Sequence, residues 1–83
     1  MKTATDQAAR RPNLGELVVV DPGILGGDPV FRGTRVPVAS LFEHLESDGS
    51  IEEFLENFPA VSREAVVAVI TAAQDLTLER ARR

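Results

Sequence analysis

The chain has 83 residues, 43% of them hydrophobic, and no cysteine, which excludes a disulfide framework, a thiolate nucleophile and a zinc–sulfur site. This length suits one small domain with a marginal core, and the net charge of −4 argues against strong non-specific binding to nucleic acid. Residues 1–13 lack the apolar segment of a secretory signal, and the apolar-rich run at residues 65–73 is too short to span a bilayer. We therefore expect a cytoplasmic protein that makes no contact with membranes.

The first third of the chain is predicted to be a flexible leader followed by a small β unit. Residues 1–13 are polar and form the leader, while residues 14–83 form the single domain. A β-branched run at residues 17–20 predicts a strand, and the Asp-Pro-Gly that follows predicts a turn. Two further short strands are expected at residues 30–31 and 34–36.

Three helices are predicted after this β unit. Pro37 suits the first turn of the first helix, which shows apolar residues at helical spacing and ends near Gly49. Ser50 and Glu53 form a capping box that opens the second helix. Ser62 caps the third, which runs to about Arg80. The expected fold class is α+β and mainly helical: a short N-terminal β-hairpin followed by a three-helix bundle like that of helix-turn-helix proteins.

The segment at residues 26–37 holds three glycines, two prolines and two arginines, with the sequence GGDPVFRGTRVP. It lacks the lysine of a phosphate-binding loop, and Asp28 would repel a phosphate, so we predict tight turns rather than a nucleotide site. Arg32 and Arg35 have two open interpretations. They pair with acidic groups or helix carbonyls, or they contact DNA or a partner protein from a rigid turn.

No metal, cofactor or catalytic site is predicted. His44 is the only histidine, and a single histidine without cysteine is a poor metal ligand set. Glu52 and Glu56 share one helix face, but such carboxylates usually form a solvated surface. Three short helices leave little room for an active-site pocket. We therefore expect a protein that is not an enzyme.

The third helix is unusually apolar. Its residues 64–73 read EAVVAVITAA, and a helix that is apolar on nearly all sides is buried within its own chain or against another. A domain this small can hardly cover both flanks, so we expect a homodimer or a partner-bound form. The predicted dimer or partner interface comprises Val19, Val66, Val67, Val69 and Ile70.

The end of the third helix is charged, reading ERARR at residues 79–83. It is either a solvated helix end or a segment that binds a partner protein. Arginines are well suited to meet the carboxylates of an acidic active site. The residues predicted to bind such a partner are Leu78, Arg80, Arg82 and Arg83.

Three segments together resemble a family of small prokaryotic proteins known as domain of unknown function 433. They are GGDPVFRGTRVPV, the acidic DGSIEEFLENFP and the helix start VSREAV, and the resemblance covers about residues 17–78. The family pattern G-x-P-x-x-x-G-T-R-x-P falls on Gly27, Pro29, Arg32, Gly33, Thr34, Arg35 and Pro37. Asp28 departs from it, since a basic or neutral residue is common there. The resemblance assigns no catalytic role to these positions.

The resemblance implies a helix-turn-helix protein, and many such proteins look like antitoxins of the VapB type. On this interpretation the chain binds and silences a PIN-like ribonuclease toxin and can repress its own promoter. The predicted DNA contacts are Arg32, Arg35 and Arg63. The alternative is a stand-alone DNA-binding regulator or a non-enzymatic adaptor.

Overall fold

The computed structural model describes residues 14–82, and the predicted leader at residues 1–13 lies outside them together with Arg83. The described part of the chain starts with one helical turn, α2 (Leu14–Leu17), which leads directly into strand β1 (Val18–Val19). Strand β2 (Val30–Phe31) pairs with β1 in the antiparallel sense. The hairpin expected from the sequence is therefore present, although both strands are only two residues long.

The connection between the strands contains a short 3₁₀ turn, η1 (Leu25–Gly27). Gly26 and Gly27 have φ angles of 66° and 95°, which lie in the left-handed region that favours glycine. The glycines thus serve the turn, as predicted.

The strand predicted at residues 34–36 is not formed. Thr34 Oγ1 donates to the carbonyl of Phe31 at 2.7 Å and accepts from the N–H of Val36 at 3.0 Å, which folds this segment into a turn. Beyond the turn only an isolated bridge joins Val30 to Pro37. The N–H of Val36 bonds to Thr34 Oγ1 and not to the carbonyl of Phe31, so the ladder does not extend, and helix α3 begins after Pro37.

Helices α3 (Val38–Glu46) and α4 (Ile51–Asn57) begin and end where the sequence predicts. Pro37 is the N-cap of α3, and the capping box at the start of α4 is confirmed: Ser50 Oγ accepts from the N–H of Glu53 at 3.1 Å, and Glu53 Oε1 accepts from the N–H of Ser50 at 2.9 Å. Asp48 leaves α3 with a φ of 66°. These local interactions explain the short joint between the two helices.

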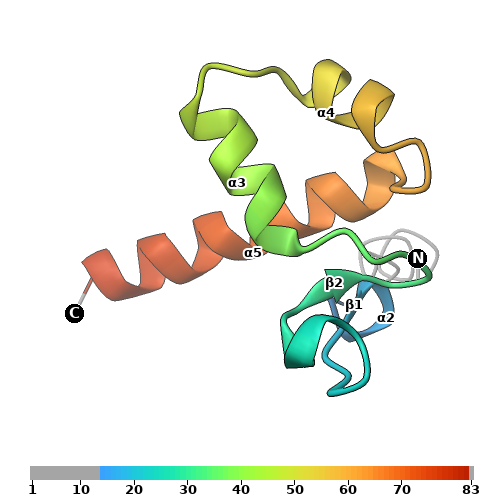
Figure 1. Cartoon of the computed structure of the whole chain (residues 1–83). Coiled ribbons are helices and arrows are strands. Elements are labelled where there is room, and N and C mark those ends of the chain that lie inside the picture. Colours follow the sequence, from blue (N-terminus) through green and yellow to red (C-terminus); the bar gives the residue numbers. More distant parts are fainter. Residues whose placement is uncertain (1–13, 83) are drawn as a thin grey trace, which may run out of the picture.

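Helix α5 (Arg63–Ala81) has 19 residues and is the longest element. The N–H of Ala65 donates to Ser62 Oγ at 3.1 Å, which confirms the predicted cap. In Figure 1 the first part of α5 lies beneath α3 and α4, whereas its C-terminal part extends away from the body. The longest dimension of the molecule, 42 Å against 28 and 27 Å for the other two, agrees with this extension.

One hydrophobic core joins the hairpin to the three helices. Its buried members are Phe31, Leu41, Phe54, Val61, Ala65, Val66 and Val69. The ring of Phe54 lies at its centre, with ring centroids 6.2 Å from Phe31 and 4.8 Å from Phe58. The core thus covers one flank of α5 and leaves the other flank open.

This core corrects part of the predicted partner interface. Val66 and Val69 are 0% and 6% exposed and pack within the chain's own core, so they are not available to a partner. Ile70 and Val19 are half-buried, and Ile70 packs against the same core. Val67 is 49% exposed and remains accessible. The prediction treated the helix as one apolar surface, whereas Phe31, Leu41 and Phe54 together suffice to bury one side of it.

Candidate protein-binding site

The C-terminal half of α5 is exposed on every side. All residues from Gln74 to Arg82 are exposed, including Leu76 at 51% and Leu78 at 42%. An isolated helix of this length is marginal in water, so this half depends on the packed half that precedes it. We define residues 74–82 as the projecting half of α5.

The projecting half presents two leucine–arginine pairs on opposite faces. Residues four apart lie on the same helix face, so Leu76 is next to Arg80, and Leu78 is next to Arg82. At about 100° per residue the two pairs are on opposite sides of the cylinder. Leu76 was not singled out by the sequence analysis, although its spacing from Arg80 repeats that of Leu78 from Arg82.

An open groove of about 600 Å³ lies along the outer flank of the first half of α5. Val67 and Leu14 are its large apolar members, and Leu14 comes from α2, whose contact with α5 the sequence did not reveal. The lining is mostly apolar, with charged residues near both ends of the groove. Its members are Leu14, Arg63, Glu64, Val67, Ala68, Thr71, Ala72 and Asp75.

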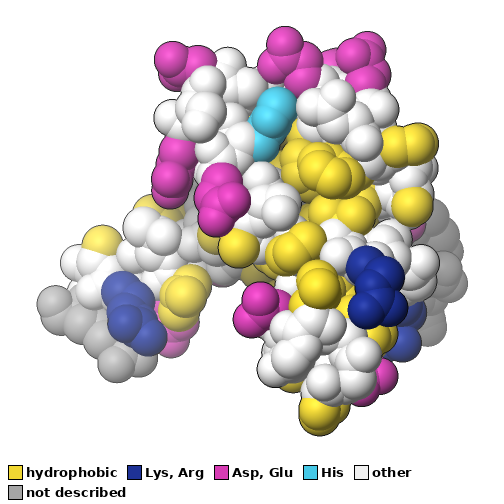
Figure 2. Space-filling view, in the orientation of Figure 1, with side chains coloured by type: hydrophobic (Ala, Val, Ile, Leu, Met, Phe, Trp, Pro, Cys, Tyr) yellow, Lys and Arg dark blue, Asp and Glu magenta, His cyan; other side chains and the backbone are white. Residues whose placement is uncertain are grey.

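Acidic side chains gather elsewhere, over α3 and α4 at the top of Figure 2. The projecting half, at the left of the same view, carries arginine, apolar and acidic side chains. The molecule therefore has an acidic end and a separate helical extension on which two leucines are followed by two arginines, with Asp75 and Glu79 among them.

Arg32 has a structural role. Its Nε donates to the carbonyl of Glu16 at 2.8 Å and its Nη2 to the carbonyl of Gly15 at 2.9 Å, so the guanidinium binds the backbone of α2. The N–H of Arg32 also donates to the carbonyl of Leu17 at 2.8 Å. Of the two interpretations that the sequence left open, the pairing with helix carbonyls describes Arg32.

Arg35 and Arg63, the other predicted DNA contacts, are both exposed. Arg63 Nη1 lies 3.3 Å from Glu52 Oε2, an ion pair that joins the start of α5 to α4. No residue between 14 and 82 forms a hydrogen bond or ion pair with the Arg35 guanidinium. The three arginines therefore differ in their partners: Arg32 binds the backbone of α2, Arg63 pairs with Glu52, and Arg35 has no such partner among the described residues.

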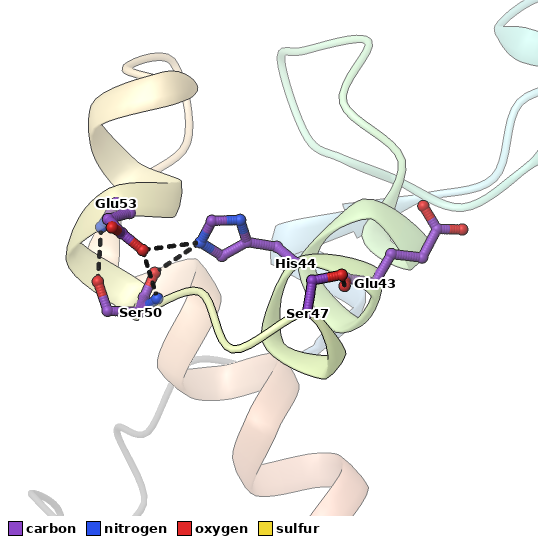
Figure 3. A network of polar contacts seen from close by, with 5 residues as sticks. All are labelled: Glu43, His44, Ser47, Ser50 and Glu53. Carbon is purple, nitrogen blue, oxygen red and sulfur yellow. Dashed lines mark hydrogen bonds and ion pairs between the residues drawn. The ribbon is translucent and has the colours of Figure 1, made fainter.

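A second, polar hollow lies where α3 meets α4. His44 Nε2 donates to the carbonyl of Ser50 at 2.9 Å and lies 3.9 Å from Glu53 Oε1 (Figure 3). This network connects the C-terminal end of α3 to the N-terminus of α4.

Gly49 is required by this network. A Cβ at this position would approach the His44 ring to 2.2 Å, so Gly49→Ala must displace the ring from Ser50. We expect the free energy of unfolding to fall by about 1 kcal/mol, the typical value of the hydrogen bond that is lost. Chemical denaturation measures this change. Gly23→Ala is the matched control, since its Cβ would lie 3.4 Å from the nearest side-chain atom, and an equal loss in both variants would contradict the expectation.

Within residues 14–82 no group of three or more His, Cys, Asp or Glu side chains is placed to hold a metal ion. No helix in the same part of the chain is both long enough and apolar enough to cross a membrane.

Comparison with known proteins identifies the family. The model of the family described as "Protein of unknown function (DUF433)" matches residues 18–72, which is more than half of the chain. The chain belongs to the DUF433 family. The matched range contains the hairpin, α3, α4 and the packed half of α5. It ends at residue 72, two positions before the projecting half begins at residue 74.

Two relatives of this DUF433 chain are informative. The uncharacterized protein y4eO of Sinorhizobium fredii is 43% identical over 61 residues, which are 74% of this chain and 26% of that protein. The chain thus spans about a quarter of the length of that relative. The crystal structure of a DUF433 member protein from Anabaena variabilis has a TM-score of 0.63 at 24% identity, and the match covers 96% of this chain and 74% of that one. This second likeness shows that the fold is shared.

Proposed function

We propose that this DUF433 protein is the antitoxin of a type II toxin–antitoxin module, a cytoplasmic protein without catalytic activity that binds and inhibits a PIN-like ribonuclease. The observation that carries the proposal is the projecting half of α5. A folded helix that exposes Leu76 and Leu78 at 51% and 42% has apolar surface that a partner chain would cover.

The chemistry of the projecting half suits an acidic active site. Arg80 and Arg82 each lie one turn after a leucine, so each face offers an apolar anchor followed by a cation. Guanidinium groups bind carboxylates in a bidentate manner, and the carboxylates of a nuclease site would be covered by such contacts. Inhibition would then follow from exclusion of the RNA substrate. Arg83, which the sequence analysis also assigned to this surface, lies outside the described residues.

The proposal is tested by co-expression with the PIN-like ribonuclease encoded beside the gene of this chain. We expect the full chain to restore growth, to co-purify with the ribonuclease and to abolish its RNA cleavage in vitro. A ribonuclease that stays fully active in the presence of excess chain would refute the proposed function. So would an adjacent reading frame whose product has no acidic nuclease site.

Repression of the module's own promoter is the second part of the proposal. The short segment at residues 58–62, which joins α4 to α5, supports a helix-turn-helix interpretation of these two helices. Of the three arginines predicted to contact DNA, Arg35 and Arg63 are the two whose guanidinium groups do not bind the backbone of α2. If they bind phosphates, promoter affinity should fall steeply between 50 and 200 mM salt. An affinity that is flat with salt would leave toxin binding as the sole function.

A further inference from the structure

Helix α5 carries one continuous stripe on the side that faces away from the core. The stripe runs through the groove and onto the projecting half, and its members are three or four residues apart except for the adjacent pair Val67 and Ala68. They are Glu64, Val67, Ala68, Thr71, Asp75, Leu78 and Arg82. Its first part lines the groove, and its last part lies on the exposed projecting half. The described part of the chain therefore covers neither part.

We propose that two copies of the chain pair along this stripe, with their α5 helices antiparallel. In this arrangement Arg82 of each copy faces Glu64 of the other, and Leu78 enters the groove opposite Ala68. Thr71 then faces Asp75 of the second copy, whose carboxylate can accept the hydroxyl hydrogen. The surface is complementary to itself, as the two-fold symmetry of a homodimer requires.

The charges favour this alignment over its alternatives. Parallel helices would place Glu64 against Glu64 and Arg82 against Arg82. Sliding the antiparallel helices by one turn in one direction places Asp75 against Asp75. Sliding them in the other direction carries Arg82 past the start of the second helix and leaves Glu64 opposite Leu78. Only the proposed alignment pairs both terminal charges with opposite charges.

The shape of the molecule also permits the pairing. The core packs on the flank of α5 that holds Val66 and Val69, so the two bodies would lie on opposite sides of the helix pair. Ala68 has a small side chain and leaves room for Leu78, while Leu14 forms an additional apolar wall. Each projecting half is then covered by the groove of the second copy.

This inference divides the projecting half between two partners. Leu78 and Arg82 face the second copy, and Leu76 and Arg80, on the opposite face, remain for the ribonuclease. Only this division depends on the proposed function. The pairing itself is measured on the isolated chain, so that a failed dimer and a failed toxin interaction are separate results.

The test is sedimentation equilibrium of the full chain over a range of concentrations, with charge-reversed variants. We expect a homodimer whose dissociation constant rises about tenfold in Glu64→Arg and in Arg82→Glu, because each change sets two repulsive pairs in place of two attractive ones. The double variant Glu64→Arg/Arg82→Glu should return to within about threefold of the original value. Circular dichroism confirms that each variant stays folded.

Cysteine cross-linking provides a second measurement, because the chain has no cysteine of its own. An equimolar mixture of Ala68→Cys and Leu78→Cys chains should form a mixed disulfide. Ala68→Cys alone should not form one, because its two copies would be roughly 15 Å apart along the helix pair. A chain that stays monomeric at every concentration would overturn the proposal. This holds equally if residues 1–13 cover the groove in place of a second copy and if a ribonuclease does so. A dimer unaffected by both charge reversals, with no cross-link in the mixture, would overturn it equally.

Discussion

Replacing Phe54 by alanine should leave the domain largely unfolded at room temperature. The side chain is 0% exposed and its ring contacts those of Phe31, His44 and Phe58, with centroids 6.2, 5.8 and 4.8 Å away. Removal of a buried phenylalanine costs about 3–5 kcal/mol. The whole stability of a small domain is only about 5–15 kcal/mol, and a domain of this size is expected at the lower end of that range. Thermal unfolding followed by circular dichroism measures the effect.

The matched control for Phe54→Ala is Leu76→Ala. Leu76 is 51% exposed on the projecting half, so its truncation leaves no cavity and should change stability by less than about 0.5 kcal/mol. A Phe54→Ala protein with a midpoint of unfolding close to that of the original chain would show that the aromatic cluster does not hold the domain together. Comparable losses in both variants would show that the projecting half is packed in solution.

The double variant Leu76→Asp/Arg80→Glu should lose capture of the PIN-like ribonuclease while the domain stays folded. The change replaces an apolar anchor by a carboxylate and reverses the adjacent charge, so it sets negative groups against an acidic site. Central interface residues each contribute about 2 kcal/mol or more, and we expect affinity to fall by roughly a thousandfold. Calorimetric titration of the ribonuclease with the full-length variant measures the loss.

Its matched control is Val20→Asp/Arg35→Glu, which makes the same chemical changes at exposed positions of the β unit. Val20 is 66% exposed and lies outside α5. We expect this control to bind the ribonuclease as the original chain does. Undiminished capture by Leu76→Asp/Arg80→Glu would remove that face from the interface. Equal losses in both double variants would indicate that net charge, rather than a defined surface, governs binding.

Local chemistry made most of the helical part predictable. The capping box of Ser50 and Glu53, the cap at Ser62 and the proline before α3 act within a few residues, and each was recognised in the sequence and found in the structure. The apolar spacing likewise placed Leu41 and Phe54 on the inner faces of their helices, and both are fully buried. Interactions between near neighbours are encoded by short patterns, which explains this agreement.

Pairings between distant residues were not predictable in the same way. The strand expected at residues 34–36 depended on β propensity, but Thr34 Oγ1 bonds to the carbonyl of Phe31 and to the N–H of Val36, so a turn forms instead. Arg32 binds the carbonyls of Glu16 and Gly15, which precede it in the sequence by 16 and 17 positions. The periodic spacing of apolar residues in a sequence does not predict a hydrogen bond between residues so far apart along the chain.

By itself, therefore, the sequence of this DUF433 protein determined its family, the order of α3, α4 and α5, and the apolar, arginine-ended character of α5, but it did not predict α2. Which side of that helix is buried was decided by the tertiary structure alone. Val66 and Val67 are adjacent and chemically identical, yet one is 0% and the other 49% exposed. The difference arises because Phe31, Leu41 and Phe54, brought together from three separate elements, pack against one flank only, and hydrophobic burial depends on which neighbours are present in space.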